Sequence, residues 1–353
     1  MPSINRKKFL EAIRFVSIVV PDRTPSPILQ YAKLSVSEGK AKIVATDHDV
    51  RVGCKIDCDS DEISCLVPCK KISDLLSASS DEEFSISLTT GGIKIVDSSG
   101  SYTLLTPPTD GFPIQNTKFE VDCKTDSIYL NRALPLITTC VNDKFKGKFV
   151  LDGVRFDTDG DKVVMVGTDE RRICSCVIGE GKIEGFTLPM KAVRVVARME
   201  GAISIGCRKG IATFLSDDKF VVSRTLQDCF PKFWGSIIEQ GKDLPEWKGA
   251  VSDLEVALRK AAVFSAEETR GLDMVIDQRT TTILAKGADI GHSSIQIQGG
   301  GEKPVKLRFN GLDLYQFVTK IPDVARVVTR VGDRISMDVG DWCKFCMSTM
   351  EVE

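Results

Sequence analysis

The sequence predicts an α+β protein of three tandem, similar domains, and three observations lead to that prediction. Phe112-Pro113 recurs as Phe230-Pro231, and Thr46-Asp47 recurs as Thr168-Asp169, each after an interval of about 120 residues. Each copy of the repeat holds two segments with apolar residues at three- and four-residue spacing, which is typical of amphipathic helices. The segments between them alternate apolar and polar residues, as half-buried antiparallel strands do.

The first domain is expected to span residues 1–120. Its first helix is predicted over residues 6–16, where Phe9, Ile13 and Val16 share one face. A second helix is predicted over residues 70–76. Three closing strands are then expected at 84–88, 92–96 and 102–106.

The second and third domains are expected to span residues 121–245 and 246–353, with linker-like stretches at 114–117 and 241–246. Two helices and about eight short strands per copy suit a domain of this size. The third copy has Ala288-Asp289 where the others have Thr-Asp, so the copies have diverged. The predicted helices are 130–141, 190–199, 254–264 and 312–318, and the closing strands are 203–205, 211–214, 220–223, 327–330, 334–337 and 343–350.

The composition indicates a soluble protein of the reducing cytoplasm. No apolar run is long enough to span a bilayer, and the first residues do not form a signal-peptide core. Twelve cysteines in 353 residues are too sparse for a disulfide scaffold.

The charge is unevenly distributed along the chain. Lys and Arg number 47 against 49 Asp and Glu, so the whole protein is not basic. Four of the six predicted helices nevertheless carry a net positive charge, and the other two have a net charge of zero. The rest of the chain therefore carries a net negative charge. Positive helices on one wall would attract phosphates without reading bases, which predicts sequence-independent binding of duplex DNA.

The sequence gives little support to catalysis. His48 and His292 are the only histidines, and no phosphate loop, nucleophile elbow or zinc-protease motif occurs. We therefore expect neither an enzyme nor a bound cofactor.

Two alternatives from other functional classes remain open. Cys54, Cys58, Cys65 and Cys69 offer four thiols for a zinc site in a DNA-associated regulatory protein, although Cys54 and Cys58 would lie ~13 Å apart along one strand. The segment is interpreted as two strands joined at residues 59–62. The other alternative is a DNA-processing enzyme that uses the carboxylates Asp157, Asp159 and Asp161.

Short motifs in a fixed order over the whole chain resemble the beta subunit of bacterial DNA polymerase III, the sliding-clamp family. They lie at residues 23–29, 45–47, 66–71, 112–113, 149–153, 166–169 with Arg172, 188–191, 230–231, 260–265, 268–271 and 309–310. The resemblance implies the DNA-clamp fold and a head-to-tail homodimer, a ring of six domains with helices around a central hole.

The resemblance also implies a function in DNA replication. Such a ring is a processivity factor that encircles duplex DNA and tethers other proteins to it. The implied partners are the replicative DNA polymerase, the clamp loader, repair polymerases, mismatch-repair proteins and ligase.

The functional residues follow from the charge pattern and the resemblance together. The expected DNA contacts are Arg23, Lys70, Lys71, Lys191, Arg194 and Arg198. The expected dimer interface places Val263 and Phe264 against Lys71, Tyr102 and Leu104 of the other subunit.

A pocket for extended partner peptides is expected between the second and third domains. Its predicted residues are Leu151, Thr168, Glu170, Arg171, Arg172, Ile173, Pro231, Ser236, Met347, Ser348, Thr349 and Met350. The chain departs from the family pattern at Glu170-Arg171, where Gly-His is usual, at Gly235, where Arg is usual, and at its ending from Ser348 to Glu351.

Overall fold

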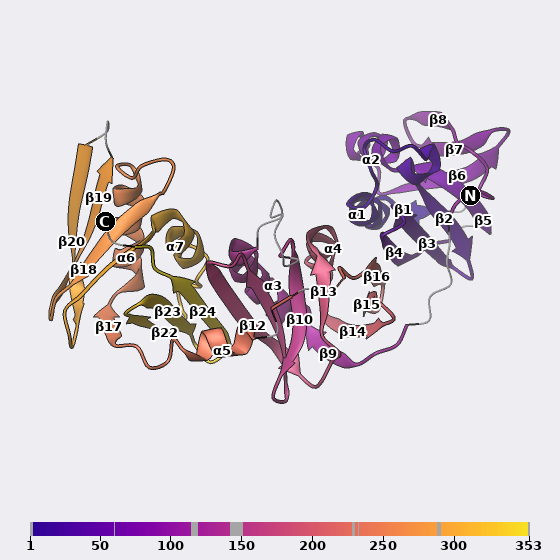
Figure 1. Ribbon diagram of the computed structural model, residues 1–353. Helices are drawn as coiled ribbons and strands as arrows, with labels where there is room; N and C mark the ends of the chain where they lie inside the picture. The colour runs from indigo at the N-terminus through magenta and orange to yellow at the C-terminus, as the bar shows by residue number, and fades with distance from the viewer. Residues whose placement is uncertain are drawn as a thin grey trace. The chain divides into compact units, whose positions relative to one another are not determined.

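The computed structural model describes residues 3–59, 61–113, 119–141, 151–227, 230–231, 233–287 and 291–351. It divides into two compact units. Unit 1 comprises Met1–Ser127 and Leu188–Leu226, and unit 2 comprises Ile128–Thr187 and Gln227–Glu353. Figure 1 shows the elements of each unit along the chain.

One order of elements occurs three times in the described part of the chain: a strand, a helix, four strands, a second helix and three strands. The first copy comprises β1 (Ile4–Asn5), α1 (Arg6–Ser17), β2 (Tyr31–Ser37), β3 (Lys40–Thr46), β4 (Val50–Asp57), β5 (Ile63–Pro68), α2 (Cys69–Ala78), β6 (Glu83–Thr89), β7 (Gly92–Asp97) and β8 (Gly100–Leu105). A short 3-10 helix, η1 (Pro27–Gln30), precedes β2.

The second copy repeats this order with a 3-10 turn, η2 (Thr138–Cys140), after its first helix. It comprises β9 (Cys123–Asp126), α3 (Ser127–Ile137), β10 (Gly153–Asp159), β11 (Lys162–Thr168), β12 (Arg172–Glu180), β13 (Phe186–Pro189), α4 (Met190–Val196), β14 (Ala202–Arg208), β15 (Ile211–Leu215) and β16 (Lys219–Arg224).

The third copy follows an additional short helix, α5 (Trp234–Glu239). It comprises β17 (Glu246–Gly249), α6 (Val251–Ala262), β18 (Gly271–Ile276), β19 (Thr280–Gly287), β20 (Gly291–Gly301), β21 (Val305–Asn310), α7 (Gly311–Val318), β22 (Val327–Val331), β23 (Arg334–Val339) and β24 (Cys343–Ser348). The prediction of two helices and about eight strands per copy is confirmed.

The strands form three antiparallel sheets, each a multiple of four strands wide. Their orders are β1-β6-β7-β8, then β5-β2-β3-β4-β16-β15-β14-β9, then β13-β10-β11-β12-β24-β23-β22-β17-β20-β19-β18-β21. Two of the sheets continue from one copy of the repeat into the next. Strand β4 of the first copy pairs with β16 of the second, and β12 of the second pairs with β24 of the third. The fold class is therefore the predicted one.

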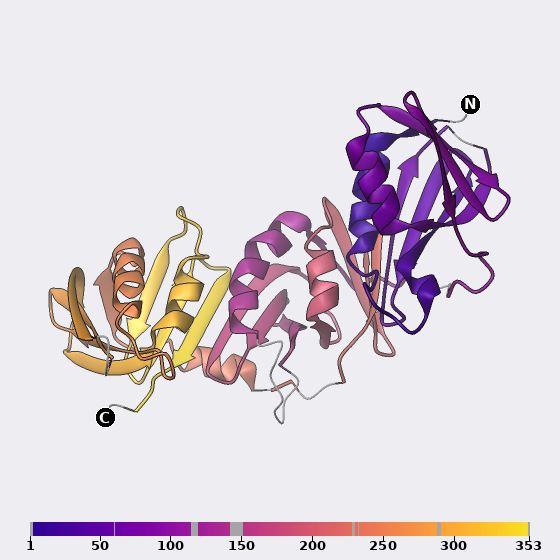
Figure 2. The same ribbon diagram turned by 90° about the horizontal axis from the view of Figure 1, so that it is seen from above.

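Helix α1 shows how sequence pattern sets local structure. The Asn5 side chain accepts a hydrogen bond from the Lys8 N–H at 3.0 Å, which caps the first turn. Phe9, Ile13 and Val16 recur at helical spacing and are buried. This face packs on β3 and β4, and α1 lies beside α2, as Figure 2 shows.

Several predicted helix ends differ from the observed ones by two to four residues. The helix expected at 130–141 begins at Ser127 and gives way to η2, where the Thr138 hydroxyl bonds to the Leu134 carbonyl at 2.8 Å. The helix expected at 190–199 ends at Val196. Backbone hydrogen bonds of the 3-10 type, from Arg198 to Val195 and from Met199 to Val196, continue the turn to Met199. None of the helices in the described residues is long and apolar enough to cross a membrane.

Candidate functional site

The Thr-Asp motif of the second copy builds a tight turn between β11 and β12. The Asp169 carboxylate accepts hydrogen bonds from the backbone N–H groups of Arg171 and Arg172, at 3.1 and 3.0 Å. The Thr168 hydroxyl donates to the Arg172 carbonyl at 2.8 Å. Glu170 adopts a positive φ of 75° inside this turn, a conformation that the side-chain bonds hold in place.

The first copy builds the same turn between β3 and β4. The Asp47 carboxylate accepts from Asp49 and Val50, and the Thr46 hydroxyl donates to the Val50 carbonyl at 3.0 Å. His48, at φ 80°, takes the place of Glu170. The motif that revealed the repeat is therefore primarily a turn motif.

The turn of the second copy is fixed to helix α7 through Arg172. Its Nε donates to the Asp169 carboxylate at 2.8 Å, and its Nη1 lies 3.3 Å from Asp313 Oδ1. A further bond of 3.3 Å reaches Gln316. Because the Arg172 side chain is only 9% exposed, its charge is used inside unit 2 and is not available at a pocket surface.

Two of the predicted pocket residues, Leu151 and Ile173, lie in one buried apolar cluster on the opposite face of the sheet. The cluster is closed by helix α5, which supplies Trp234 and Ile238. The Trp234 indole also donates to Asp157 at 3.3 Å. The cluster members are Leu151, Val164, Val166, Ile173, Phe230, Trp234, Ile238 and Cys346, with Val177 and Ile237 packed against them.

Met347 does not join this cluster. It pairs with Arg172 across β12 and β24, whereas its neighbour Cys346 pairs with Ile173. Successive strand residues point to opposite faces, so Met347 lies on the face of Arg172 and α7 and is 2% exposed. Met347 and Leu151 therefore lie on opposite faces of the sheet, and a pocket that both residues line stays a prediction.

The remaining predicted pocket residues surround the turn. The Ser348 N–H donates to the Arg171 carbonyl at 2.8 Å, and the Met350 N–H donates to the Arg308 carbonyl at 2.7 Å, so the chain end is anchored at both points. Glu170, Arg171, Ser236 and Ser348 are exposed, Thr349 and Met350 are half-buried, and Thr168 and Pro231 are buried.

The prediction from sequence missed helix α5 and the exposed Phe233 before it. Phe233 is 56% exposed beside the buried Trp234. Trp234 and Ile238 stand four residues apart, which was the available signal, but six residues are too few for a periodic pattern to stand out.

The predicted DNA-contacting residues differ in how their charges are used. Lys191 forms an ion pair with Asp47 and donates to the Val19 carbonyl at 3.2 Å, so much of its charge is neutralised within unit 1. Arg194 and Arg198 are exposed on or just after α4. Arg23, Lys70 and Lys71 are exposed as well.

The predicted interface residues lie near unpaired edges and an exposed apolar side chain. Strand β8, which carries Tyr102 and Leu104, is the last strand of its sheet. Val263, at the end of α6, is 66% exposed and lines a cavity of about 480 Å³, while Phe264 is half-buried. On β8, Leu105 is 77% exposed.

The four cysteines of the zinc hypothesis do not converge. Cys54 lies on β4 and Cys65 on β5, and β2 and β3 separate these strands in the sheet, which places them ~14 Å apart. The expectation of two strands adjacent in the chain is right, but they do not pair with each other. Cys69 is buried as the first residue of α2, and Cys58 is half-buried beyond β4.

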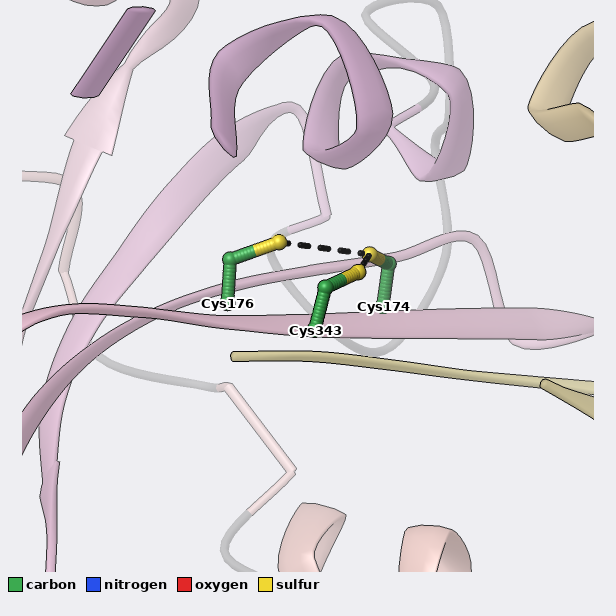
Figure 3. Close-up of side chains that lie close together, drawn as sticks. All are labelled: Cys174, Cys176 and Cys343. Carbon is green, nitrogen blue, oxygen red and sulfur yellow. Dashed lines mark hydrogen bonds between the residues drawn. The ribbon is translucent and has the colours of Figure 1, made fainter. Parts of the chain in front are cut away.

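A different cysteine cluster lies in unit 2, as Figure 3 shows. Cys174 Sγ lies 3.8 Å from Cys176 Sγ and 3.6 Å from Cys343 Sγ. In the described part of the chain these are the only three His, Cys, Asp or Glu ligand atoms that lie close together. Sequence reasoning missed the cluster because Cys343 is distant in the chain from the other two.

The cluster fits core packing better than metal binding. Burial raises the pKa values of the Cys174 and Cys176 thiols well above their ordinary range, so both stay protonated. Burial also acts to raise the pKa of Cys343, but hydrogen bonds from the other two thiols and the nearby Arg132 charge bring it down to about 6. A metal centre would need several thiolates, whereas this arrangement favours one at most.

The carboxylates of the enzyme hypothesis do not form a shared site. Asp157 pairs with Arg155 at 3.2 Å, and Asp161 pairs with Lys182 at 3.4 Å. Their charges are used in separate ion pairs along β10 and its turn, so no arrangement for two-metal chemistry results.

Comparison with known proteins gives one consistent answer. Residues 2–116 match the family profile described as DNA polymerase III beta subunit, N-terminal domain. The beta sliding clamp of Haemophilus influenzae is 22% identical over 324 residues, covering 88% of this chain and 85% of that protein. The beta sliding clamp of Escherichia coli K12 is 23% identical over 305 residues, covering 81% of each.

Solved structures share the fold over the full length. The DNA polymerase III subunit beta of Pseudomonas aeruginosa covers 100% of both chains, with a TM-score of 0.90 at 18% identity. The sliding clamp of the same organism bound to griselimycin covers 99% of both, with a TM-score of 0.91 at 17% identity. The repeated order of elements, the profile matched by residues 2–116 and relatives that cover more than four-fifths of the chain agree: the chain is similar over most of its length to the beta subunit of bacterial DNA polymerase III.

Proposed function

We propose that this protein is a DNA sliding clamp, a non-catalytic processivity factor of DNA replication in the cytoplasm that encircles duplex DNA and holds partner proteins on it. The observation that carries the proposal is the threefold recurrence of one order of elements. Three domains, at 1–120, 121–245 and 246–353, are half of a six-domain ring, so two copies of the chain would complete it.

The ring is proposed to close head to tail. Edge strand β8 of one subunit would meet the third domain of the other near Val263, with Lys71, Tyr102, Leu104 and Phe264 around the contact. Exposed Leu105 and Val263 supply apolar area that a dimer would bury. Pairing of the β8 edge would also remove an open template for aggregation.

Contact with DNA is proposed to depend on the helices. Arg194 and Arg198 are exposed cations on or just after α4, whereas Lys191 is half-buried and forms an ion pair with Asp47. Arg23, Lys70 and Lys71 add exposed positive charge in unit 1. Contacts of this kind attract the phosphate backbone and leave the ring free to slide.

Partner tethering is proposed to use the surface around the Thr168–Arg172 turn. Exposed Phe233 and half-buried Met350 provide anchors for an extended peptide, and Glu170, Arg171 and Ser236 provide a polar rim. The peptides would come from the replicative polymerase and the clamp loader, and from repair polymerases, mismatch-repair proteins and ligase.

The sliding function is tested by topology. The protein is loaded by the clamp loader of its own organism with ATP onto a nicked circular plasmid, and bound protein is separated by gel filtration. Cutting the plasmid once with a restriction enzyme should release the protein, because a ring slides off an end. Retention on linear DNA, or a sequence-specific footprint, would overturn the proposal.

The tethering surface is tested with a polymerase-derived peptide by calorimetry. Truncation should begin at Thr349, because Met347 and Ser348 belong to β24 and their loss would disrupt the sheet. The truncated protein and a Phe233→Ser variant should each bind the peptide about tenfold more weakly or worse. A Val324→Ser variant, at a site that is 97% exposed elsewhere in unit 2, is the matched control.

A further inference from the structure

The eight-stranded sheet of unit 1 has one face that α1 leaves uncovered. Helix α1 contacts β3 and β4, and the Lys219 ammonium, opposite Cys54, lies 5.5 Å from the Phe15 ring of α1. Side chains alternate between the two faces along a strand, so the neighbours of Cys54 and Lys219 in sequence lie on the opposite face, which we call the outer face. Cross-strand pairing places Lys33, Val44, Gly53, Phe220 and Leu215 in one row there.

A cavity of about 350 Å³ opens on the outer face. Its apolar lining consists of Val44, Phe119, Leu215 and Phe220. The Phe119 and Phe220 rings meet edge to face at 5.5 Å. Phe220 seats directly on the Gly53 backbone, since a Cβ at Gly53 would lie 2.2 Å from the Phe220 ring. This volume suits one or two apolar side chains of a ligand.

The rest of the lining carries five cations, four of them on the outer face and the fifth Lys219. Lys42 and Lys55 stand directly opposite each other on β3 and β4, and Arg51 and Lys33 line the same cavity. Like charges in a directly opposed pair destabilise a sheet. Burial and the neighbouring Lys55 and Arg51 charges lower the pKa of Lys42. Within the described part of the chain, Lys33, Lys42 and Lys55 lie beyond 4 Å of any carboxylate, so their mutual repulsion is not relieved by an ion pair.

The second copy of the repeat shows what this pair of positions holds in an ordinary core. Counting from the Thr-Asp motif, Lys42 and Lys55 correspond to Val164 and Val177, which also pair across their strands. In unit 2 this face is apolar and is covered by Trp234 of α5. Among the described residues of unit 1 the same face carries positive charge and no counterpart of α5 covers it, a difference that a bound ligand would account for.

We propose that this outer-face cavity of unit 1 is a second docking site, which binds an acidic peptide segment of a partner protein with one apolar side chain packed against Phe119 and Phe220. Charge complementarity identifies the ligand as anionic, and the small apolar interior identifies it as a peptide. Asp217 and Asp218 also stand in the wall of the cavity and would repel anionic groups there, so the acidic side chains of the peptide would contact the lysines of β2, β3 and β4. A phosphate backbone offers no apolar side chain for the interior, which disfavours a polynucleotide. The site adds to the proposed clamp function and does not depend on it.

The test measures fluorescence anisotropy of a fluorescein-labelled peptide of sequence EELEELEE with the full-length protein at low and high salt. The peptide QQLQQLQQ and the oligonucleotide dT8 are compared in parallel. We expect the acidic peptide to bind most tightly and to weaken as salt rises. Equal binding of the glutamine peptide, tighter binding of dT8, or failure of the acidic peptide to bind would each overturn the proposal.

Two variants locate the binding. Lys33→Gln/Lys42→Gln/Lys55→Gln should weaken it about tenfold or more, while Lys94→Gln/Lys124→Gln/Lys209→Gln removes equal charge elsewhere in unit 1 and should leave it unchanged. Lys42→Val/Lys55→Val installs the apolar pair found in unit 2. It should abolish binding while the melting temperature stays the same or rises, which separates loss of the site from loss of the fold. Full affinity in the Lys33→Gln/Lys42→Gln/Lys55→Gln variant or in the Lys42→Val/Lys55→Val variant would contradict the assignment.

Discussion

The guanidinium of Arg172 contacts Asp313 twice: its Nη1 lies 3.3 Å from the carboxylate and 3.1 Å from the backbone carbonyl. Arg172 begins β12 in the second copy of the repeat, and Asp313 lies in the first turn of α7 in the third. Together with the β12–β24 pairing, this contact fastens the proposed peptide-binding turn to the rest of unit 2. The position of that turn therefore depends in part on this largely buried ion pair.

Replacing Arg172 with Ala should lower the free energy of unfolding by about 3 kcal/mol, because Asp169 and Asp313 would lose the cation that they share. Arg172→Lys should recover only part of this, since an ammonium cannot reproduce the forked contacts. Urea denaturation measures both. Arg171→Ala, at the exposed neighbouring position, is the control, and an equal loss there would contradict the explanation.

Asp313 should make stability fall as pH rises through the acid range. Burial raises its pKa, and although Arg172 opposes this, the folded-state value stays above the ordinary 3.8. The folded protein therefore holds the proton more tightly, so the favourable contribution is present below 3.8 and is lost as pH rises through the folded pKa. The stability difference between the wild type and Asp313→Asn should shrink or reverse with rising pH, and a constant difference would refute this.

Val263→Glu should convert the proposed dimer to a monomer without unfolding the chain. The side chain is already 66% exposed, so a charge costs little in the free subunit, but it would be buried in the proposed interface. Light scattering after gel filtration at low micromolar concentration gives the mass. Val324→Glu, at a side chain that is 97% exposed, should remain dimeric. If both variants keep the mass of two 38.7 kDa subunits, Val263 is not at the interface.

Arg194→Gln/Arg198→Gln should weaken DNA contact equally for all sequences and reduce the salt slope of binding by about one to two. Lys191→Gln should act differently, because its partner Asp47 would lose an ion pair; we expect mainly a lower melting temperature. Binding to a short duplex over a range of salt concentrations tests the first variant. An unchanged slope would remove Arg194 and Arg198 from the DNA-facing surface.

Cys176→Ala should destabilise unit 2 through packing alone, by about 1–2 kcal/mol, because a buried sulfur is replaced by a small void. Treatment with a chelator should leave the melting temperature of wild type and variant unchanged, and elemental analysis of the purified protein should find zinc well below one equivalent. Stoichiometric zinc that is lost with Cys176→Ala would show that the cluster is a metal site.

The repeat could be predicted from sequence because short, local sequence patterns determine its turns, helices and strands. The Thr-Asp pair marks a turn whose side-chain bonds close within five residues, and the 3.6- and 2-residue periods mark which element follows. Helix ends were less well predicted, as at α3 and α4, because hydrogen bonds of the 3-10 type continue the chain past the regular helix.

The sites depended more on tertiary structure. The sequence suggested that Leu151 and Ile173 lie together, and both belong to one buried cluster. The register of β12 against β24 decided that Met347 points to the other face of the sheet, where Arg172 forms an ion pair with Asp313. The same applies to the cysteines: residues close in the chain were separated by two intervening strands, while Cys174, Cys176 and Cys343 came together.

By itself, the sequence determined the α+β class, the threefold order of helices and strands and the resemblance to the beta subunit family, because each of these rests on spacing along the chain. Tertiary structure alone decided which described charges form ion pairs, where α5 covers the sheet, and that Lys42 and Lys55 stand opposite each other on the outer face of β3 and β4. Those features arise from pairing between distant strands, and a shift of one residue in register would move every side chain to the other face.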